Sequence, residues 1–248
     1  MKHFTPPIGI NLPIYCVHEL RKAFGLIGKF LDLNDLYNKN KTLYRFFARN
    51  AYWEANPRVA EIPLVLYYVG KYLVPPARIL DVGYLESFLP YFLSSIGFEV
   101  FGVDIRETPF YLIGANIRTI KQDICKLILE TKFDAITLIS TLEHIGLGYG
   151  DTKDLTKDKE ALSKVYDLLD SQGLLFVSVP MYKEFRVIEN FEKHYDYKNF
   201  IKLLESAGFK ILEEKYVARK GNFWIVEDLS ECLKRKDTFV GFFVCGKG

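Results

Sequence analysis

Three acidic residues, Asp81, Asp104 and Asp123, follow apolar runs at intervals along the chain. In nucleotide-binding strand-helix-strand units, the carboxyl end of the first strand and the N-terminus of the following helix face the ligand. An acid that ends the second strand accepts hydrogen bonds from both ribose hydroxyls, and each such charge-assisted bond contributes about 1.5–3 kcal/mol. Because Asp104 holds that place, the pattern predicts a ribosyl ligand such as a nucleoside.

The elements that must position these acids follow from the pattern of apolar residues. From residue 78 onward, apolar segments of strand length alternate with amphipathic segments of helix length. The expected strands are 78–83, 99–104, 118–122, 134–140, 174–179 and two near 209–218 and 238–245, and the expected helices are 87–96, 157–170 and 197–207. Gly173 is expected to stop the second of these helices. Such alternation predicts a parallel sheet with helices on both faces.

The first part of the chain has a different pattern. Helical periodicity covers 12–30 and 42–52, and a third helical segment, which Pro57 opens, runs to residue 73. Two prolines then close this region. We expect residues 1–74 to be a helical extension that covers the site as a lid, and residues 75–248 to be the nucleotide-binding domain.

The composition limits the possible functions without selecting one. With 248 residues, of which 49% are hydrophobic and 26% charged, the chain can bury a full core. Lys and Arg total 33 against 31 Asp and Glu, which gives a formal net charge of +2. Because such a chain has no general positive field, its composition does not favour a nucleic acid as partner.

The cysteines and the N-terminus indicate a reducing, cytoplasmic location. The four cysteines, Cys16, Cys125, Cys232 and Cys245, have no paired spacing, which argues against a zinc ribbon or a disulfide framework. Two prolines stand where a signal peptide needs an apolar core, and no uninterrupted apolar run is long enough to span a bilayer. We therefore expect free thiols in a protein that is not membrane-bound.

Three further segments indicate the kind of nucleotide-binding fold. In the first, residues 133–135 open a strand that runs into Ser-Thr-Leu-Glu-His-Ile-Gly at 140–146. In the second, Ser-Gln-Gly at 171–173 precedes an apolar strand that ends in Val-Pro at 179–180. In the third, Ala-Gly-Phe at 207–209 opens two long strands. These segments resemble the class I S-adenosylmethionine-dependent methyltransferases over residues 78 to about 246. The resemblance implies an α/β fold with a Rossmann-like, mostly parallel seven-stranded sheet whose last strand is antiparallel. It also implies S-adenosyl-L-methionine as the cofactor.

The resemblance also implies the residues that contact the cofactor. Carried over position by position, these are Asp81 and Gly83 beside the methionine moiety, Asp104 on the ribose with Ile105 next to it, Asp123 and Ile124 at the adenine, and Ser140 and Thr141 beside the reacting methyl group. Each has a physical reason to serve. A carboxylate offers two acceptor oxygens to a diol or an exocyclic amine, and Ile124 can present a backbone N–H and an apolar side chain to the ring edge.

The loop after the first strand departs from the family pattern. The family reads Asp-x-Gly-x-Gly-x-Gly, whereas residues 81–87 read Asp-Val-Gly-Tyr-Leu-Glu-Ser, so that Leu85 and Ser87 replace two glycines. Glycine serves there because a Cβ blocks the approach of the backbone to the ligand. We expect a different path in which Gly83 still makes the tight turn and Ser87 caps the next helix. Glu86 is then near the ligand, where its charge attracts the sulfonium or the α-ammonium. Residues 142–151 narrow the resemblance to a branch with such a loop that often accompanies glycan biosynthesis.

Glu143 and His144 are the candidate catalytic residues. Methyl transfer is an in-line displacement that needs a general base only when the acceptor is a hydroxyl or a protonated amine. An unperturbed histidine titrates near neutral pH, so His144 suits that role. The alternatives are that His144 bonds a backbone carbonyl and shapes the pocket, and that Glu143 is a salt-bridge partner. Asp151, His194 and Asp196 show no spacing typical of a metal site, and no metal is expected.

Other classes of protein share parts of this pattern. Arg58 can meet a carboxylate of cofactor or substrate, or serve in helix packing. A dinucleotide oxidoreductase needs a second glycine so that the backbone can approach the pyrophosphate, and Leu85 stands at that position instead. A base amino-methyltransferase is expected to carry Asn/Asp-Pro-Pro-Tyr/Phe after the fourth strand, which is absent at 140–143. The sequence thus predicts methyl transfer to oxygen or nitrogen of a small molecule or glycan precursor. The alternative is a methyltransferase-like scaffold without cofactor.

Overall fold

The structure, a computed structural model, describes residues 57–107, 117–148, 151, 153–189, 191–221 and 223–248. The helices expected at 12–30 and 42–52, and Cys16, lie outside these ranges. Cys125, Cys232 and Cys245 are free and buried, as expected. No helix within the described ranges is both long enough and apolar enough to cross a membrane.

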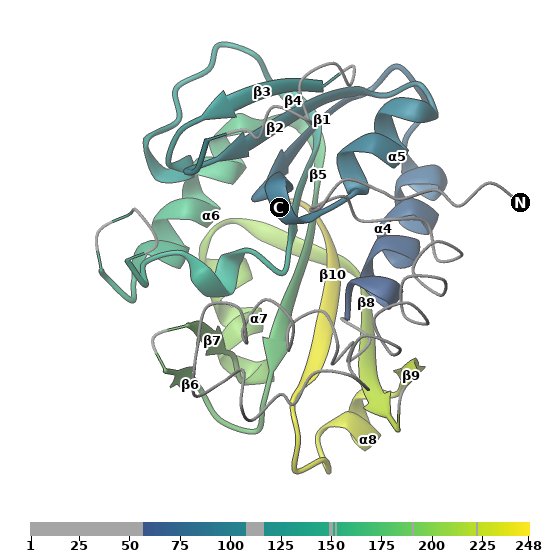
Figure 1. The fold of residues 1–248 in the computed structure, drawn as a ribbon, viewed down its shortest axis with the longest axis vertical. Helices are drawn as coiled ribbons and strands as arrows, with labels where there is room; N and C mark the ends of the chain where they lie inside the picture. Colours follow the sequence, from purple (N-terminus) through teal and green to yellow (C-terminus); the bar gives the residue numbers. More distant parts are fainter. Residues whose placement is uncertain (1–56, 108–116, 149–150, 152, 190, 222) are drawn as a thin grey trace, which may run out of the picture. The chain divides into compact units, whose positions relative to one another are not determined.

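One eight-stranded sheet organises the described residues (Figure 1). Its strands, in spatial order, are β3 (Ile117–Lys121), β2 (Glu99–Asp104), β1 (Arg78–Val82), β4 (Phe133–Ile139), β5 (Leu169–Met181), β10 (Phe239–Lys247), β8 (Phe209–Lys220) and β9 (Phe223–Glu227). The first five are parallel, whereas β10 is antiparallel to both of its neighbours, and β9 is antiparallel to β8. The expectation of a mostly parallel sheet with an antiparallel last strand is confirmed.

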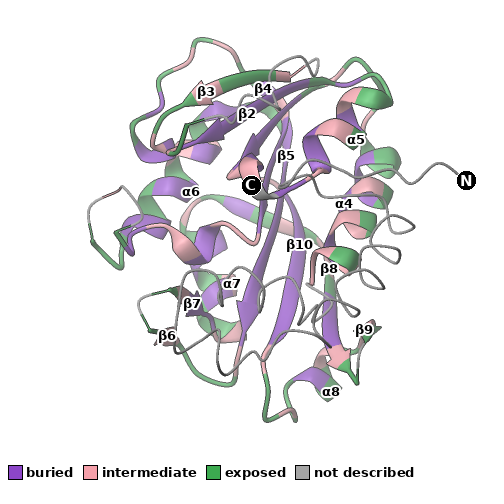
Figure 2. Cartoon of the chain, in the orientation of Figure 1, coloured by how far each residue is buried: buried purple, intermediate pink, exposed green. Residues whose placement is uncertain are grey.

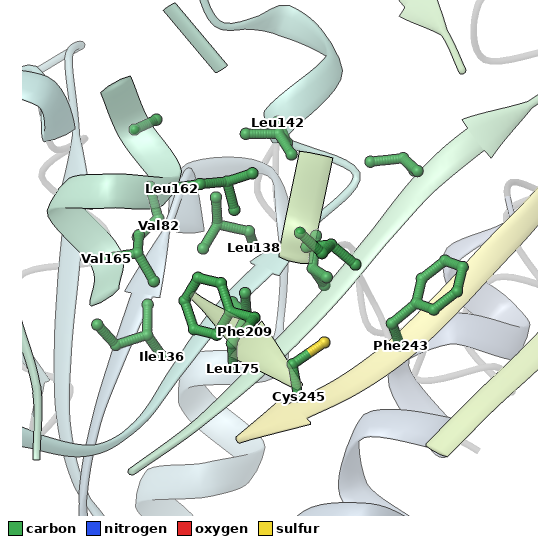
Figure 3. Packing of buried hydrophobic residues seen from close by; sticks show 14 of the residues in the cluster. Val82, Ile136, Leu138, Leu142, Leu162, Val165, Leu175, Phe209, Phe243 and Cys245 are labelled. Carbon is green, nitrogen blue, oxygen red and sulfur yellow. The ribbon is translucent and has the colours of Figure 1, made fainter. Parts of the chain in front are cut away.

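Helices cover both faces of the sheet, because successive strand residues point to opposite sides. Helices α4 (Arg58–Tyr72) and α5 (Leu89–Ser95) pack on the face that includes Ile79. Helices α6 (Lys157–Leu168) and α7 (Tyr197–Ser206) pack on the opposite face, which includes Leu80. Figure 2 shows the central strands buried between these layers. In Figure 3 side chains of α6 lie close to those of β4 and β5.

The structure differs from the expected elements in four places. Helix α6 ends at Leu168, and Leu169 pairs at once with Phe133, so that β5 begins without a loop and Gly173 lies inside this strand instead of stopping the helix. The sheet gains β9, an edge strand of sequence Phe-Trp-Ile-Val-Glu in which no residue is buried. A small separate hairpin, β6 (Arg186–Ile188) and β7 (Glu192–His194), follows β5, and a short helix α8 (Leu229–Cys232) follows β9.

Short 3-10 turns follow three of the parallel strands at their carboxyl ends. They are η1 (Tyr84–Glu86) after β1, η3 (Ile124–Lys126) after β3 and η4 (Leu142–His144) after β4. Because parallel strands end at the same edge of a sheet, these turns lie along one edge, where α/β proteins bind their ligands. The residues expected to do chemistry therefore belong to one edge of the sheet.

The turn after β1 is held by a contact between Tyr84 and Gly102. Tyr84 is buried, and a Cβ built on Gly102 of β2 would lie 2.6 Å from the Cγ atom of its ring. A side chain at position 102 would therefore displace the ring. Glycine in this strand makes room for the aromatic residue that fixes the path of the loop.

We expect Gly102→Ala to lower the free energy of unfolding by about 1–3 kcal/mol, the usual cost of overpacking. Gly70→Ala in α4 is the matched control, because a Cβ there meets nothing within 4 Å. This control should be neutral or more stable by about 0.5–1 kcal/mol, since alanine favours helix over glycine. Urea unfolding measures both, and equal midpoints for Gly102→Ala and wild type would contradict the proposed contact.

Candidate functional site

Asp81 is a buried carboxyl group that is only half satisfied. It is 2% exposed, and its strand neighbour Thr137 donates a hydrogen bond of 2.6 Å to Oδ1. Its Oδ2 atom has no hydrogen-bond partner among the described residues. Burial raises the pKa of Asp81 to about 7, while the Thr137 hydrogen bond and the charge of Arg58 lower it and the charge of Asp104 raises it. A buried oxygen of this kind is suited to a cationic or hydrogen-bond-donating ligand.

The loop after β1 makes its tight turn at Gly83. Gly83 has φ +77°, and a Cβ there would lie 2.5 Å from Oγ1 of Thr141, so the turn brings the ends of β1 and β4 together. The Ser87 hydroxyl accepts a 3.0 Å hydrogen bond from the Leu89 N–H, whereas the N-cap residue of α5 is Phe88. The side chain of Glu86 lies outside the described part of the chain.

Asp104 is bound by an arginine two residues away. Its Oδ1 accepts from the backbone N–H and Nε of Arg106 at 2.9 and 3.0 Å, and its Oδ2 accepts from Nη2 at 2.9 Å. A carboxylate has about four lone-pair sites, so these three bonds leave too few for both hydroxyls of a ribose. A ribose at Asp104 therefore has to displace at least one contact of Arg106. Ile105 lies between the two residues and is half-buried.

At the end of β3, Asp123 already has partners on its own chain. Its carboxylate accepts from the Cys125 N–H at 3.0 Å, and Lys157 of α6 lies 3.4 Å from Oδ2. The side chain of Ile124 is 5% exposed and belongs to the core on the α6 side. A ligand that reached this position would thus meet the backbone of Ile124 more readily than its side chain.

Ser140, at the end of β4, has an unusual backbone conformation that a hydrogen-bond network supports. Its φ is +45°, a left-handed value that costs energy in any residue with a Cβ. Its hydroxyl and that of Ser178 donate to Oε1 of Glu61 at 2.8 and 2.7 Å, and the Ser140 N–H donates to the Ser178 hydroxyl at 3.0 Å. Glu61 on α4 therefore holds the end of β4 in place.

Glu61 was not among the expected site residues, although the sequence contains a signal for it. It is 0% exposed, and its Oε2 atom has no hydrogen-bond partner within the described ranges. Burial raises its pKa, while the Ser178 hydrogen bond, the charge of Arg58 and the Ser140 hydrogen bond lower it. Arg58, one turn earlier, has its Nη2 atom 3.5 Å from the carbonyl oxygen of Ser140. Glu61 shares the apolar face of α4 with Val65, and an acid on such a face is a sign of burial.

Glu143 and His144 belong to η4. Glu143 is 2% exposed, and its Oε2 has no partner in the part of the chain that the structure describes. Burial raises the pKa of Glu143 well above its usual range, while a hydrogen bond from its own backbone lowers it. The negative charges of Glu61 and Glu192 also raise this pKa, and the charge of Arg58 lowers it. Burial thus favours the neutral form of the Glu143 carboxyl by raising its pKa.

His144 is oriented by a hydrogen bond between one ring nitrogen and a backbone carbonyl. Its Nδ1 lies 2.7 Å from the carbonyl oxygen of Phe191, and a carbonyl only accepts, so Nδ1 carries the hydrogen. Nε2 is then the basic nitrogen, 3.9 Å from Oε1 of Glu143. The backbone bond that was the alternative role for His144 is present, and it also selects the tautomer that a general base requires.

The remaining polar candidates do not join this group. Asp151 accepts from the backbone N–H of Gly148, His194 bonds Glu192 at 2.6 Å, and Asp196 caps α7. No group of three or more His, Cys, Asp or Glu side chains among the described residues is arranged to hold a metal ion.

Comparison with known proteins identifies the fold. No protein-family model and no curated protein sequence matches the chain. Among solved structures, a Burkholderia thailandensis 1,6-didemethyltoxoflavin-N1-methyltransferase, with that substrate and S-adenosylhomocysteine bound, has a TM-score of 0.58 at 17% identity over 99% of this chain and 98% of its own. The N-methyltransferase NodS from Bradyrhizobium japonicum WM9, in complex with S-adenosylhomocysteine, has a TM-score of 0.55 at 12% identity, over 78% of this chain and 89% of its own. The [4+2]-cyclase SpnF has a TM-score of 0.56 at 14% identity, over 79% of this chain and 85% of its own. The chain therefore has the fold of the class I S-adenosylmethionine-dependent methyltransferases.

Replacement of the buried acid should change how stability depends on pH. Because the folded state raises the pKa of Asp81 from 3.8 to about 7, its contribution to stability is fully present below pH 3.8 and is lost as pH rises through 7. The free energy of unfolding of Asp81→Asn, taken relative to that of wild type, should therefore rise by on the order of 4 kcal/mol between pH 4 and pH 8. Urea unfolding at a series of pH values measures the difference, and parallel curves for the two proteins would refute the assignment. Asp167→Asn, at an exposed position of α6, controls for the change in net charge.

Proposed function

We propose that the protein is an S-adenosylmethionine-dependent methyltransferase that transfers a methyl group to oxygen or nitrogen of a small molecule or glycan precursor. The observation that carries this proposal is the buried Asp81 at the end of β1, with one carboxylate oxygen lacking a partner among the described residues. The cofactor has two positive groups, an α-ammonium and a sulfonium, which match such an oxygen. The residues at this edge of the sheet therefore fit the cofactor that the fold implies.

Each part of the cofactor has a candidate partner at the edge of the sheet. In this proposal Asp81 and Gly83 receive the methionine moiety, and Arg58 receives its carboxylate as a guanidinium fork. Asp104 binds the ribose diol after Arg106 gives up at least one of its hydrogen bonds to this carboxylate. Asp123 and the backbone of Ile124 bind the adenine. Ser140 and Thr141 lie beside the reacting methyl group.

The protein contributes alignment and proton transfer to the reaction. The bound cofactor supplies an activated methyl group. The chain holds the acceptor in line with that group. The basic Nε2 of His144 then takes the proton that the acceptor loses, because Nδ1 is occupied by the Phe191 carbonyl.

A specific observation favours a second candidate, a binding protein that uses the fold without the cofactor. The guanidinium of Arg106 occupies most of the hydrogen-bond acceptor sites on the Asp104 carboxylate. In addition, Leu85 stands at a position where the family has glycine. The [4+2]-cyclase SpnF has the same fold, so the fold alone does not select methyl transfer. Affinity for the cofactor separates the two candidates.

Calorimetry with S-adenosylhomocysteine tests the proposal. Wild type should bind, and Asp104→Ala should weaken binding by at least about 100-fold, because two charge-assisted bonds are lost. Arg106→Ala should strengthen binding several-fold, because it removes the group that competes for Asp104. Asp134→Ala is the control, since Asp134 accepts from the Arg78 N–H at the opposite edge of the sheet. Absence of heat from wild type with millimolar S-adenosylhomocysteine and S-adenosylmethionine would overturn the proposal in favour of the binding protein.

A further inference from the structure

Lys193, in the hairpin that follows β5, is a fully buried lysine. Its ammonium donates to the carbonyl oxygen of Leu155 at 3.1 Å and lies 3.2 Å from Oδ2 of Asp158, in the first turn of α6. Asp158 is also buried, and it accepts from the hydroxyl of Tyr195 at 3.1 Å. A buried ion pair is often no more stabilising than apolar side chains of similar volume at the same place. Stability alone therefore does not account for this pair.

Strand β7 places Lys193 close to the carbonyl group that orients His144. Phe191 directly precedes β7, and its carbonyl oxygen lies 2.7 Å from Nδ1 of His144. The rings of Phe191 and His144 also meet edge to face, with 5.3 Å between their centroids. Strand β7 lies against η4, the turn that contains His144. Lys193 is thus two residues from the hydrogen bond that leaves Nε2 as the basic nitrogen of His144.

Other bonds hold the far end of β7. The N–H of Tyr195 donates to the carbonyl oxygen of Pro180 at 3.0 Å, and the N–H of Tyr182 donates to the carbonyl oxygen of Tyr195 at 2.8 Å. These backbone bonds join the residue after β7 to the end of β5, and Lys193 takes no part in them. The bonds from Lys193 to α6 therefore act on the part of the strand that is nearer to Phe191.

His194 has the opposite tautomer and provides a reference within the same hairpin. Its Nδ1 lies 3.1 Å from Nε and 3.0 Å from Nη2 of Arg186, and a guanidinium only donates, so Nδ1 is the acceptor. Its Nε2 carries the hydrogen and lies 2.6 Å from Oε1 of Glu192. Nη2 of Arg186 also donates to the hydroxyl of Thr238 at 3.2 Å, which joins this group to the residue before β10.

We infer that Lys193 is a positioning residue for His144. Its bonds to α6 hold the Phe191 carbonyl against Nδ1 of His144 and so keep the basic nitrogen at Nε2. The inference rests on the proposed role of His144 as the base in methyl transfer, and it names the residue that prepares that base. If the carbonyl withdraws, the bond that selects Nδ1 is lost, and a neutral ring can carry its hydrogen on either nitrogen. A ring with hydrogen on Nε2 cannot take a proton there.

Nitrogen-15 NMR of the imidazole rings tests the inference, because the correlations between ring carbons' hydrogens and ring nitrogens distinguish the two neutral tautomers. Spectra are recorded well above the ordinary histidine pKa of about 6.5, and His144→Gln assigns the His144 signals. Wild type should show hydrogen on Nδ1 of His144 and on Nε2 of His194. In Lys193→Met/Asp158→Asn the ratio of Nδ1–H to Nε2–H at His144 should fall roughly 3- to 10-fold, the contribution of one hydrogen bond. His194 should not change.

The double substitution leaves no unpaired charge buried, and the new amide still offers an oxygen to the Tyr195 hydroxyl. Lys159→Met, at an exposed lysine next to Asp158 on α6, is the matched control and should leave both histidines as in wild type. An unchanged ratio at His144 in the double variant, or a wild-type His144 with hydrogen on Nε2, would overturn the inference. A change at both histidines would overturn it too, because Lys193 would then maintain the whole hairpin.

Calorimetry with S-adenosylhomocysteine separates this inference from the function on which it rests. If the tautomers behave as expected but wild type binds no cofactor, Lys193 positions the ring and the methyltransferase proposal falls. If wild type binds S-adenosylhomocysteine but the ratio at His144 does not change in the double variant, the methyltransferase proposal stands and the role of Lys193 falls.

Discussion

The carboxylate of Glu61 ties helix α4 to the ends of β4 and β5, and the geometry of the site depends on this interaction. It accepts hydroxyl hydrogen bonds from Ser140 and Ser178, and it thereby supports the left-handed backbone of Ser140. The direction in which the chain leaves β4 sets the positions of Thr141, Glu143 and His144. Without that carboxylate the strained residue could relax, and the turn that carries the acids would change direction.

The same edge of the sheet carries three buried carboxyls, each with one oxygen that has no hydrogen-bond partner among the described residues. Buried carboxyls at Glu61, Asp81 and Glu143 each lower the stability of the empty protein when they ionise, because burial without a full set of partners penalises the charged form. Proteins retain such groups where a ligand completes them, and the gain appears as binding rather than as stability. Burial of these carboxyls thus lowers stability and at the same time leaves oxygens that a ligand can complete.

The loop after β1 shows how a familiar turn is replaced by a different packing arrangement. Gly83 keeps the positive φ that the turn requires, while Tyr84 packs against Gly102 of the neighbouring strand. The Ser87 hydroxyl accepts a hydrogen bond from the Leu89 N–H at the start of the following helix. A loop with few glycines can therefore still lead from the strand into the helix on this fold.

The sequence by itself determined the alternation of strands and helices, the α/β class, and the placement of Asp81, Asp104 and Asp123 at strand ends, because apolar periodicity is a local property of the chain. It did not predict where helix α6 stops, since pairing of Leu169 with Phe133 in the sheet overrides the local helix signal. Only the tertiary structure decided that Asp104 is held by Arg106 and that Glu61 meets Ser140. The bond between Glu61 and Ser140 joins residues 79 positions apart, and no local pattern carries the information for such a contact. Burial, which removes water from these carboxyls and so determines their chemistry, likewise exists only once the sheet and helices have packed together.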